Sequence, residues 1–252
     1  MILLLSCFLI ITTCNANNFR KLNVFGADNR ESVPDNSMAP YSAVGKLVFS
    51  DDSFCTATLV SPNYILTAGS CIYENRVQKS KTEGMLFYPA HNSTFNNAAA
   101  AITSILGETK VPETRVGLNY VLLKLDIDYG NVYGYIPIAD YEREGVIPPE
   151  SRDIMLIQYA DDNIYSASPA IQNDVRVFYN PNLEAEFSNL IIHDGDTAIR
   201  GSIGAPLLQL GPDSALVLIG IHTGGTTESS ITDASVDFNL IDSFTLERSN
   251  TR

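Results

Sequence analysis

The segment Cys55–Cys71 reads CTATLVSPNYILTAGSC and contains two short strand patterns. The runs Thr56–Ser61 and Tyr64–Ala68 are rich in β-branched and apolar residues, and a Pro-Asn pair between them favours a turn. The second run ends at two small residues, Gly69 and Ser70, directly before the second cysteine. The segment therefore predicts two neighbouring strands followed by a tight turn.

The rest of the chain from Tyr41 onward repeats this pattern of short apolar runs between Gly, Pro, Asn and Asp clusters. Such regular punctuation favours an all-β barrel or sandwich over a parallel α/β sheet. Only the C-terminal stretch SVDFNLIDSFTLER, Ser235–Arg248, predicts a short helix. The other predicted strands are Ala43–Phe49, Tyr120–Leu125, Asp153–Tyr159, Asp174–Tyr179 and Ala215–His222.

The composition is that of a globular, acidic protein. Of the 252 residues, 45% are hydrophobic and 18% are charged, which excludes a disordered chain and a coiled coil. The formal net charge of -13 repels phosphate at long range, so we expect neither nucleic acid nor an anionic membrane as a partner. We also expect no cofactor and a monomer.

The first 16 residues, MILLLSCFLIITTCNA, have the pattern of a secretory signal peptide. Their apolar run is too short to span a bilayer, and small residues follow it at Cys14 and Ala16. A retained membrane anchor, or a lipid attached to Cys14, are the alternatives. Residues 17–23 then form either a propeptide remnant or a disordered start. We expect the protein to be secreted.

Four cysteines occur in the chain, and two of them, Cys7 and Cys14, fall in the predicted signal peptide. Cys55 and Cys71 then form an even pair in an oxidising compartment, which predicts one disulfide. It closes a loop of about 15 residues and contributes about 3 kcal/mol of stability. So few cysteines give too few ligands for a zinc site.

The stretch DYEREGVIPPESR, Asp140–Arg152, is charged, contains Gly and a Pro-Pro pair, and lacks a core pattern. It predicts a linker over residues 140–153. The linker separates two strand-rich parts, residues 24–139 and residues 154–252.

Three stretches together resemble the chymotrypsin-fold serine proteases. CTATLVSPNYILTAGSC resembles the family motif that presents the catalytic histidine beside a disulfide cysteine, GLNYVLLKLD resembles the aspartate motif, and GSIGAPLL resembles the nucleophile loop. VFGADNRESV, AGSCIY and IGIHTGG are most similar to the glutamyl endopeptidase branch. The resemblance covers roughly Val24 to Gly225. It implies two antiparallel six-stranded β-barrels, one in each strand-rich part.

Carried onto this sequence, the resemblance places the catalytic base, its orienting carboxylate and the nucleophile at Ser70, Asn119 and Ile203. Ile203 has no heteroatom, Ser70 cannot accept a proton near neutral pH, and Asn119 carries no charge. Loss of the triad in a serine protease costs about a million-fold in turnover. Ser202 stands one position before the nucleophile, where a side chain on a tight loop points elsewhere. The sequence therefore predicts an inactive homologue.

The resemblance also assigns residues that bind rather than react. Gly201 matches a backbone N–H donor of the oxyanion hole, and His222 matches the histidine that faces an acidic substrate side chain in glutamyl endopeptidases. Thr197 is the candidate hydroxyl partner of His222 in this specificity pocket, although its spacing to Ile203 is one residue longer than in the family. A histidine satisfied at a strand end is the alternative interpretation of His222.

Two further motifs have simple interpretations. Asp194, Gly195 and Asp196 read as a solvated turn, so we expect no metal site. Asn92-Ser93-Thr94 is a glycosylation sequon, used only if the chain passes through a eukaryotic secretory route.

The expected function is that of a decoy or regulatory pseudoprotease, which binds a peptide, protein or protease inhibitor between the barrels without cleaving it. One alternative is an active endopeptidase that cleaves after acidic residues through a non-standard centre. The other is a vestigial structural or antigenic secreted protein.

Overall fold

A computed structural model describes residues 22–24, 27–74, 77–78, 82–92, 97–106, 119–139, 150–162, 164–165, 167–178, 190–198, 201–211, 214–225 and 239–242. The predicted signal peptide, residues 17–21 and residues 140–149 of the predicted linker lie outside these ranges. Among the described residues, no helix combines the length and apolar character needed to cross a membrane.

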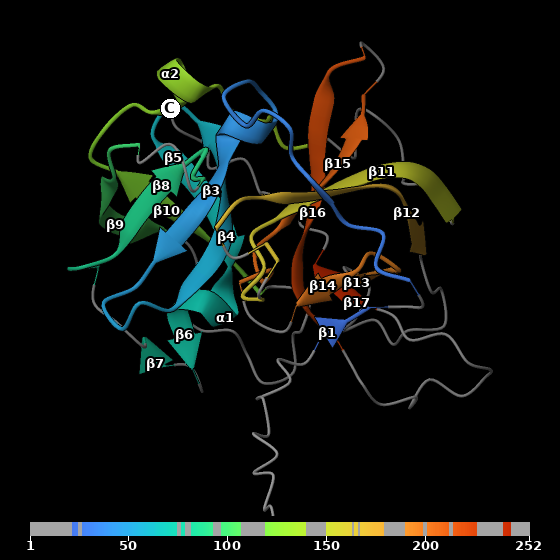
Figure 1. Ribbon diagram of the computed structural model, residues 1–252. Helices are drawn as coiled ribbons and strands as arrows, with labels where there is room; N and C mark the ends of the chain where they lie inside the picture. Colours follow the sequence, from blue (N-terminus) through green and yellow to red (C-terminus); the bar gives the residue numbers. More distant parts are fainter. Residues whose placement is uncertain are drawn as a thin grey trace, which may run out of the picture.

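Six strands of the N-terminal part form a closed antiparallel barrel, with the order β10-β5-β4-β3-β8-β9. Strand β10 shows why these residues form strands, since its alternate residues Val121, Leu123 and Leu125 are buried. Figure 1 shows this barrel on one side of the molecule. Its strands are β3 (Val44–Val48), β4 (Phe54–Ser61), β5 (Tyr64–Ala68), β8 (Leu86–Pro89), β9 (Ala100–Leu106) and β10 (Tyr120–Leu125).

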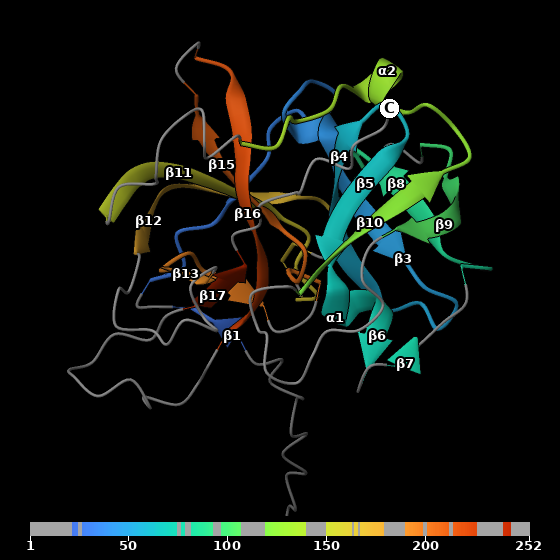
Figure 2. The same ribbon diagram turned by 180° about the vertical axis from the view of Figure 1, so that it is seen from behind.

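The C-terminal part forms a second antiparallel sheet with the order β11-β15-β16-β17-β13-β12-β2. Because β11 also pairs with β12, six of these strands are linked in a ring, which is consistent with the second barrel that the sequence predicts. Figure 2 shows this sheet beside the first barrel from behind. The strands are β2 (Glu31–Ser32), β11 (Glu150–Gln158), β12 (Ala170–Phe178), β13 (Leu190–His193), β15 (Pro206–Leu210), β16 (Leu216–Gly225) and β17 (Asn239–Asp242).

The remaining elements are short. The helices are η1 (Tyr41–Ala43), α1 (Gly69–Ile72) and α2 (Gly130–Tyr133), and the small strands are β1 (Leu22–Asn23), β6 (Tyr73–Glu74), β7 (Val77–Gln78) and β14 (Thr197–Ala198). Strand β1 pairs with β14, and β2 pairs with β12. The start of the described chain therefore lies against the second sheet, and β11 begins inside the stretch expected to be a linker.

The predicted C-terminal helix is wrong for residues 239–242, which form strand β17. This strand pairs on one side with β13 and on the other with β16. Pairing on both edges stabilises an extended segment whatever its local helical pattern. The other residues of the predicted helix lie outside the described ranges.

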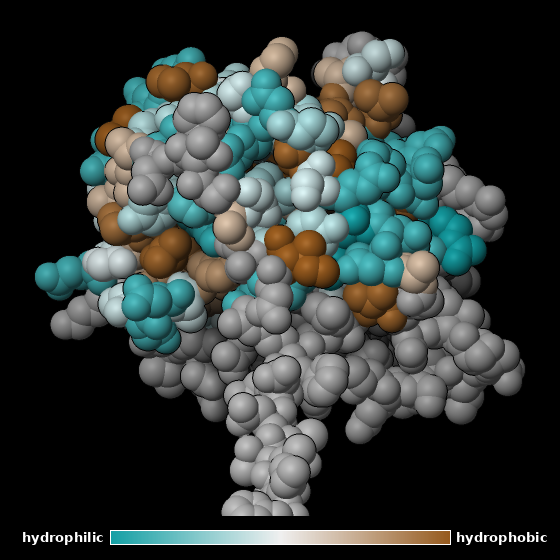
Figure 3. Space-filling view, viewed as in Figure 1, coloured by the Kyte–Doolittle hydropathy of each residue, from teal (hydrophilic) through white to brown (hydrophobic). Residues whose placement is uncertain are grey.

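One large core joins the two parts of the molecule. Most of its buried residues come from the first barrel, but Ile157, Tyr159, Leu218 and Ile221 of the C-terminal part belong to the same cluster. On the face that Figure 3 shows, apolar residues lie in separate patches among hydrophilic ones. The junction between the two parts is therefore filled by a shared core.

Candidate functional site

The first two candidate positions meet where β5 ends and α1 begins. The main-chain N–H of Ser70 donates to Oδ1 of Asn119 over 2.7 Å, and the N–H of Gly69 donates to the carbonyl oxygen of Asn119 over 2.9 Å. Asn119 thus holds the start of α1 by its side chain and its main chain. The Oγ of Ser70 is buried and has no hydrogen-bond partner among the described residues.

Ile203 lies on the loop before β15, against the first barrel. Its carbonyl oxygen accepts the N–H of Thr56 over 2.9 Å, and its side chain packs on the large core. The predicted disulfide is confirmed, and its Cys71 sulfur lies 3.9 Å from the same carbonyl oxygen of Ile203. Because Cys71 follows Ser70 directly, the structure brings all three predicted triad positions into one region.

Gly204 fixes the shape of this loop. Its φ is +88°, and a Cβ added there would collide with the carbonyl oxygen of Thr56 and with Oγ1 of Thr67. Its N–H donates to the carbonyl oxygen of His222 over 2.7 Å. Only glycine fits at this position without displacing main-chain atoms.

Gly201, at the predicted oxyanion position, also has a left-handed backbone with φ +80°. Its carbonyl oxygen accepts the Oγ1–H of Thr56 over 2.7 Å, and the N–H of Tyr159 donates to the same Oγ1 over 3.0 Å. The hydroxyl of Thr56 therefore connects the first barrel to two segments of the second. Gly201 is therefore held by a buried hydroxyl of the first barrel.

Ser202, the neighbour of the nucleophile position, points into the second barrel. It is fully buried, and its Oγ donates to Oε1 of Gln158 over 2.5 Å. Gln158 in turn donates from Nε2 to the carbonyl oxygen of Asp196 over 2.6 Å. Ser202 thus has a structural role in the side-chain network of the second barrel.

Two buried histidines, His193 at the end of β13 and His222 in β16, contact each other. The Nε2 of His193 lies 3.1 Å from Nδ1 of His222, and the N–H of Gly195 donates to Nδ1 of His193 over 3.1 Å. Since Nδ1 of His193 accepts, a neutral His193 carries its proton on Nε2 and donates it to His222. A neutral His222 then keeps its own proton on Nε2.

Burial keeps both imidazoles neutral. It lowers the pKa of His222 to about 3, and it lowers the pKa of His193 well below the usual value, with a smaller contribution from His222. A neutral imidazole N–H donates a hydrogen bond without carrying a formal charge. The pair is therefore a donor at Nε2 of His222 across the physiological pH range.

Thr197, the predicted partner of His222, lies in β14, two residues after Gly195. Its side chain is buried, and its Oγ1 has no hydrogen-bond partner among the described residues. A buried hydroxyl without a partner costs about 1–3 kcal/mol. A bound ligand with a polar group can supply the missing partner.

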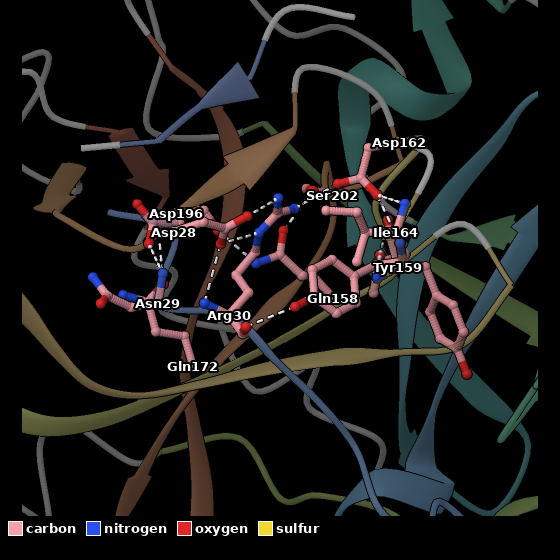
Figure 4. Close-up of polar contacts among 12 residues, drawn as sticks. Asp28, Asn29, Arg30, Gln158, Tyr159, Asp162, Ile164, Gln172, Asp196 and Ser202 are labelled. Atoms are coloured by element: carbon pink, nitrogen blue, oxygen red, sulfur yellow. Dashed lines mark hydrogen bonds and ion pairs between the residues drawn. The ribbon is translucent and has the colours of Figure 1, made fainter. Parts of the chain in front are cut away.

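The segment 28–30 is attached to this part of the second barrel, as Figure 4 shows. The guanidinium of Arg30 bonds Asp28 through Nε and Nη2 over 2.9 and 2.7 Å, and Asp162 through Nη1 over 2.8 Å. The N–H of Asn29 donates to Oδ2 of Asp196 over 2.8 Å. The hydrogen bond to Arg30 is the main cause that lowers the pKa of Asp28.

The two carboxylates of the predicted solvated turn both have structural partners. Asp194 accepts from Nε of Arg176 over 2.6 Å, and Asp196 accepts from Asn29. No group of three or more metal-ligating side chains occurs within the described ranges. At the sequon, the half-buried Asn92 donates from Nδ2 to Oδ1 of Asn36 over 2.8 Å. A glycan would replace one of the two hydrogens on that nitrogen.

Comparison with known proteins agrees with the fold. The family model described as trypsin matches residues 28–240 of the chain. The chain belongs to the trypsin family. Membership of this family, together with the barrel, confirms the predicted chymotrypsin-like, mostly β fold.

Two solved proteases have similar folds. A Glu endopeptidase, solved in complex with MPD, has a TM-score of 0.69 at 23% identity, covering 88% of this chain and 94% of that one. Protease Anisep from Arthrobacter nicotinovorans has a TM-score of 0.61 at 11% identity, covering 85% of this chain and 93% of its own. At such identities the likeness shows the fold alone.

A shorter match links the chain to a protein of Mus musculus named inactive serine protease 35. The two are 37% identical over 60 residues, which are 23% of this chain and 14% of the mouse protein. The chain therefore spans only a small part of that relative.

Sequence reasoning assigned no role to Gln158 and His193, which contact Ser202 and His222. It interpreted Asp196 as part of a solvated turn, which is wrong because Asp196 is buried and accepts a main-chain hydrogen bond from Asn29. For His193, the available signal was the rarity of histidine, which occurs three times in the chain. Gln158 ends a predicted strand and carries no separate signal.

Proposed function

We propose that this chain is a secreted, catalytically inactive member of the trypsin family that binds a peptide, a protein or a protease inhibitor at the junction between its two barrels. The observation that carries the proposal is the identity of the residues at the three predicted triad positions, none of which can serve the catalytic role of that position. Ser70, Asn119 and Ile203 stand in a framework whose main-chain hydrogen bonds are intact.

Peptide hydrolysis by this family requires a nucleophile, a base that takes its proton, and a carboxylate that orients the base. The side chain of Ile203 is a hydrocarbon, and the amide of Asn119 is used to hold α1. Ser202 cannot replace the nucleophile, because its hydroxyl is buried and bonded to Gln158. The histidines His193 and His222 are engaged with each other.

Two buried groups on the other side of the site support binding. We assign Nε2 of His222 and Oγ1 of Thr197 as hydrogen-bond donors to an acidic side chain of the ligand. The fully buried Oγ1 of Thr197 lacks a partner among the described residues, so a carboxylate there satisfies it. The neutral imidazole of His222 donates its Nε2–H to such a carboxylate, as the resemblance to glutamyl endopeptidases implies.

The test is a paired measurement on one purified sample. Hydrolysis of fluorogenic peptides with Glu before the reporter group is compared between the wild-type protein and the Ser202→Ala variant, and binding of an uncut Glu-containing peptide is measured by fluorescence anisotropy. We expect no hydrolysis in either protein and micromolar binding that weakens in the His222→Gln variant. Hydrolysis that disappears with Ser202→Ala would establish an active non-standard centre instead. Absence of any binding would favour the vestigial alternative.

A further inference from the structure

An exposed apolar surface surrounds helix α2 at one end of the first barrel. Seven large hydrophobic side chains are exposed among the described residues, and four of them come from two short segments at α2. These four residues are Met38, Ile127, Val132 and Tyr135, and we call them the α2 patch. Single exposed apolar residues are ordinary on a protein surface, whereas a group of them marks an interaction site.

Contacts between the two segments bring the members of the α2 patch together. The Oγ of Ser42 donates to the carbonyl oxygen of Tyr133 over 2.5 Å. A Cβ added to Gly134 would lie 3.3 Å from Cβ of Ala39. Met38 directly precedes Ala39, so it lies beside the end of α2. Apolar side chains are visible over α2 at the upper left edge of Figure 3, which has the same view as Figure 1.

The α2 patch lies away from the predicted triad positions. The N–H of Gly130 in α2 donates to the carbonyl oxygen of Pro62 over 2.7 Å, in the turn before β5, whereas Ser70 follows the other end of β5. A strand of this length spans about 17 Å. Figures 1 and 2 both show α2 and α1 at opposite ends of the first barrel. A ligand that covers the patch therefore leaves the triad positions uncovered.

The charge around the patch is negative. Residues 33–43 and 126–139 contain Asp35, Asp126 and Asp128, all three exposed, and no lysine or arginine. Lys124 is two residues before Asp126, and its Nζ lies 6.0 Å from the ring centroid of Tyr64. The whole chain has a formal net charge of -13. Like charges repel, so this surface disfavours a second copy of the chain and favours a basic partner.

We propose that the α2 patch docks a basic segment of another protein. Apolar side chains of the partner cover Met38 and Val132, which are 67% and 73% exposed, and its arginines lie beside Asp35 and Asp128. Burial of the apolar side chains supplies most of the affinity, and the charges exclude acidic partners. The ring of Tyr135 favours arginine over lysine, because a guanidinium stacks on an aromatic face. This interaction is additional to ligand binding at the junction between the barrels.

The test uses a fluorescein-labelled peptide of arginine, leucine and serine, whose binding to the purified protein is measured by fluorescence anisotropy. One control peptide has glutamate in place of arginine, and the other has serine in place of leucine. We expect the first peptide to bind at least about ten-fold more tightly than either control, because each control lacks one of the two contributions. An excess of uncut Glu-containing peptide should not displace it.

Two variants locate the bound peptide. Val132→Ser removes an apolar contact and should weaken binding about ten-fold. Asp128→Asn should weaken binding about three-fold and should reduce its dependence on salt. The matched controls are Leu210→Ser, at an exposed position of β15 in the second barrel, and Glu83→Gln, at an exposed position in the turn before β8. Both control variants should bind the peptide as the wild-type protein does.

Each contrary outcome overturns the proposal in a different way. Unchanged affinity in Val132→Ser would show that the peptide binds elsewhere on the acidic surface. Equal affinity for the arginine peptide and either control peptide would remove the need for a basic, apolar partner. Displacement by the Glu-containing peptide would place the binding at the junction between the barrels. A dimer that sedimentation equilibrium detects and that Val132→Ser dissociates would make a second copy the occupant.

None of these outcomes depends on ligand binding at the junction between the barrels. The proposed function and the docking surface can therefore fail separately.

Discussion

Around Ser70, Asn119 and Ile203, which we call the centre, the framework consists largely of main-chain N–H and carbonyl groups. Around His193, Asp196, Thr197 and His222, which we call the histidine side, it consists largely of buried side chains bonded to one another or to main-chain groups. The two regions meet on one loop, since Gly204 of the centre donates to the carbonyl oxygen of His222.

The difference explains how the family fold tolerates the residues found here. A main-chain framework does not depend on which side chain occupies a position, so the centre accepts Ile203 without loss of its hydrogen bonds. On the histidine side, the stability depends on side-chain partners, because an unpaired buried polar group costs about 1–3 kcal/mol; Oγ1 of Thr197 is without one among the described residues. We therefore expect the centre to be sensitive to backbone changes and the histidine side to charge and pH.

The largest expected effect is that of Gly204→Ala. A Cβ there collides with main-chain and side-chain atoms of the first barrel and requires a strained φ of +88°. We expect a loss of about 4 kcal/mol in the free energy of unfolding, measured by urea denaturation. Gly224→Ala is the control, because no atom of the described residues lies within 4 Å of its added Cβ. Similar losses in both variants would contradict the importance of the loop framework.

Removal of Arg30 should come next in size. Its side chain is fully buried and bonds Asp28 and Asp162, whose side chain is 6% exposed. Arg30→Met leaves the carboxylate of Asp162 buried without its cation, and we expect a loss of about 3 kcal/mol. Arg176→Met breaks a more exposed pair with Asp194 and should cost less than about 1 kcal/mol. Equal effects on thermal unfolding would show that the attachment of segment 28–30 contributes little.

Much of the fold was predictable from sequence, because most strands in this chain have a recognisable local pattern of apolar and β-branched residues. The predicted bounds of Tyr64–Ala68 and Tyr120–Leu125 are confirmed residue for residue. Strand β17 was not predictable in this way, since its extended form comes from pairing with β13 and β16, which are distant in sequence. The small strands β1 and β2 were missed for the same reason.

The candidate site also contains residues that local motifs predict and residues that only tertiary contacts reveal. Motifs predicted the triad positions Ser70, Asn119 and Ile203, because the resemblance concerns contiguous stretches. The contact between His193 and His222 joins residues 29 positions apart, and no local pattern reports it. Lys46 likewise reads as a polar residue in a strand, and only the register of β3 on β4 shows that its Nζ lies 4.2 Å from the ring centroid of Phe54.

The third prediction concerns pH and tests the histidine side. The folded-state pKa values of His193 and His222 lie below the ordinary value near 6.5, so below that pH the unfolded chain binds more protons than the folded one. Stability is therefore complete above about pH 6.5 and falls as the pH drops toward 3. His91, whose pKa burial also lowers, acts in the same direction.

Each buried histidine should contribute about 1.4 kcal/mol of lost stability per pH unit in this window. Urea denaturation at pH 6, 5.5, 5 and 4.5 measures the slope. In His193→Gln, the slope should decrease by about 1.4 kcal/mol per pH unit, because one imidazole no longer takes up a proton on unfolding. A flat profile in the wild-type protein would mean that the histidine pair is not buried in a neutral state.

The smallest expected effect is that of Ile203→Ser at the centre. Ile203 is partly buried against the large core, so the change should cost only about 1 kcal/mol of stability. It restores a hydroxyl but no base, and we expect no hydrolysis of Glu-containing peptides above the wild-type background. The triple variant with Ser70→His and Asn119→Asp is the informative comparison, because the main-chain framework that holds these positions is present. If Ile203→Ser alone hydrolysed the peptide, a base would have to reach the loop from the histidine side, and the two regions could no longer be treated as separate.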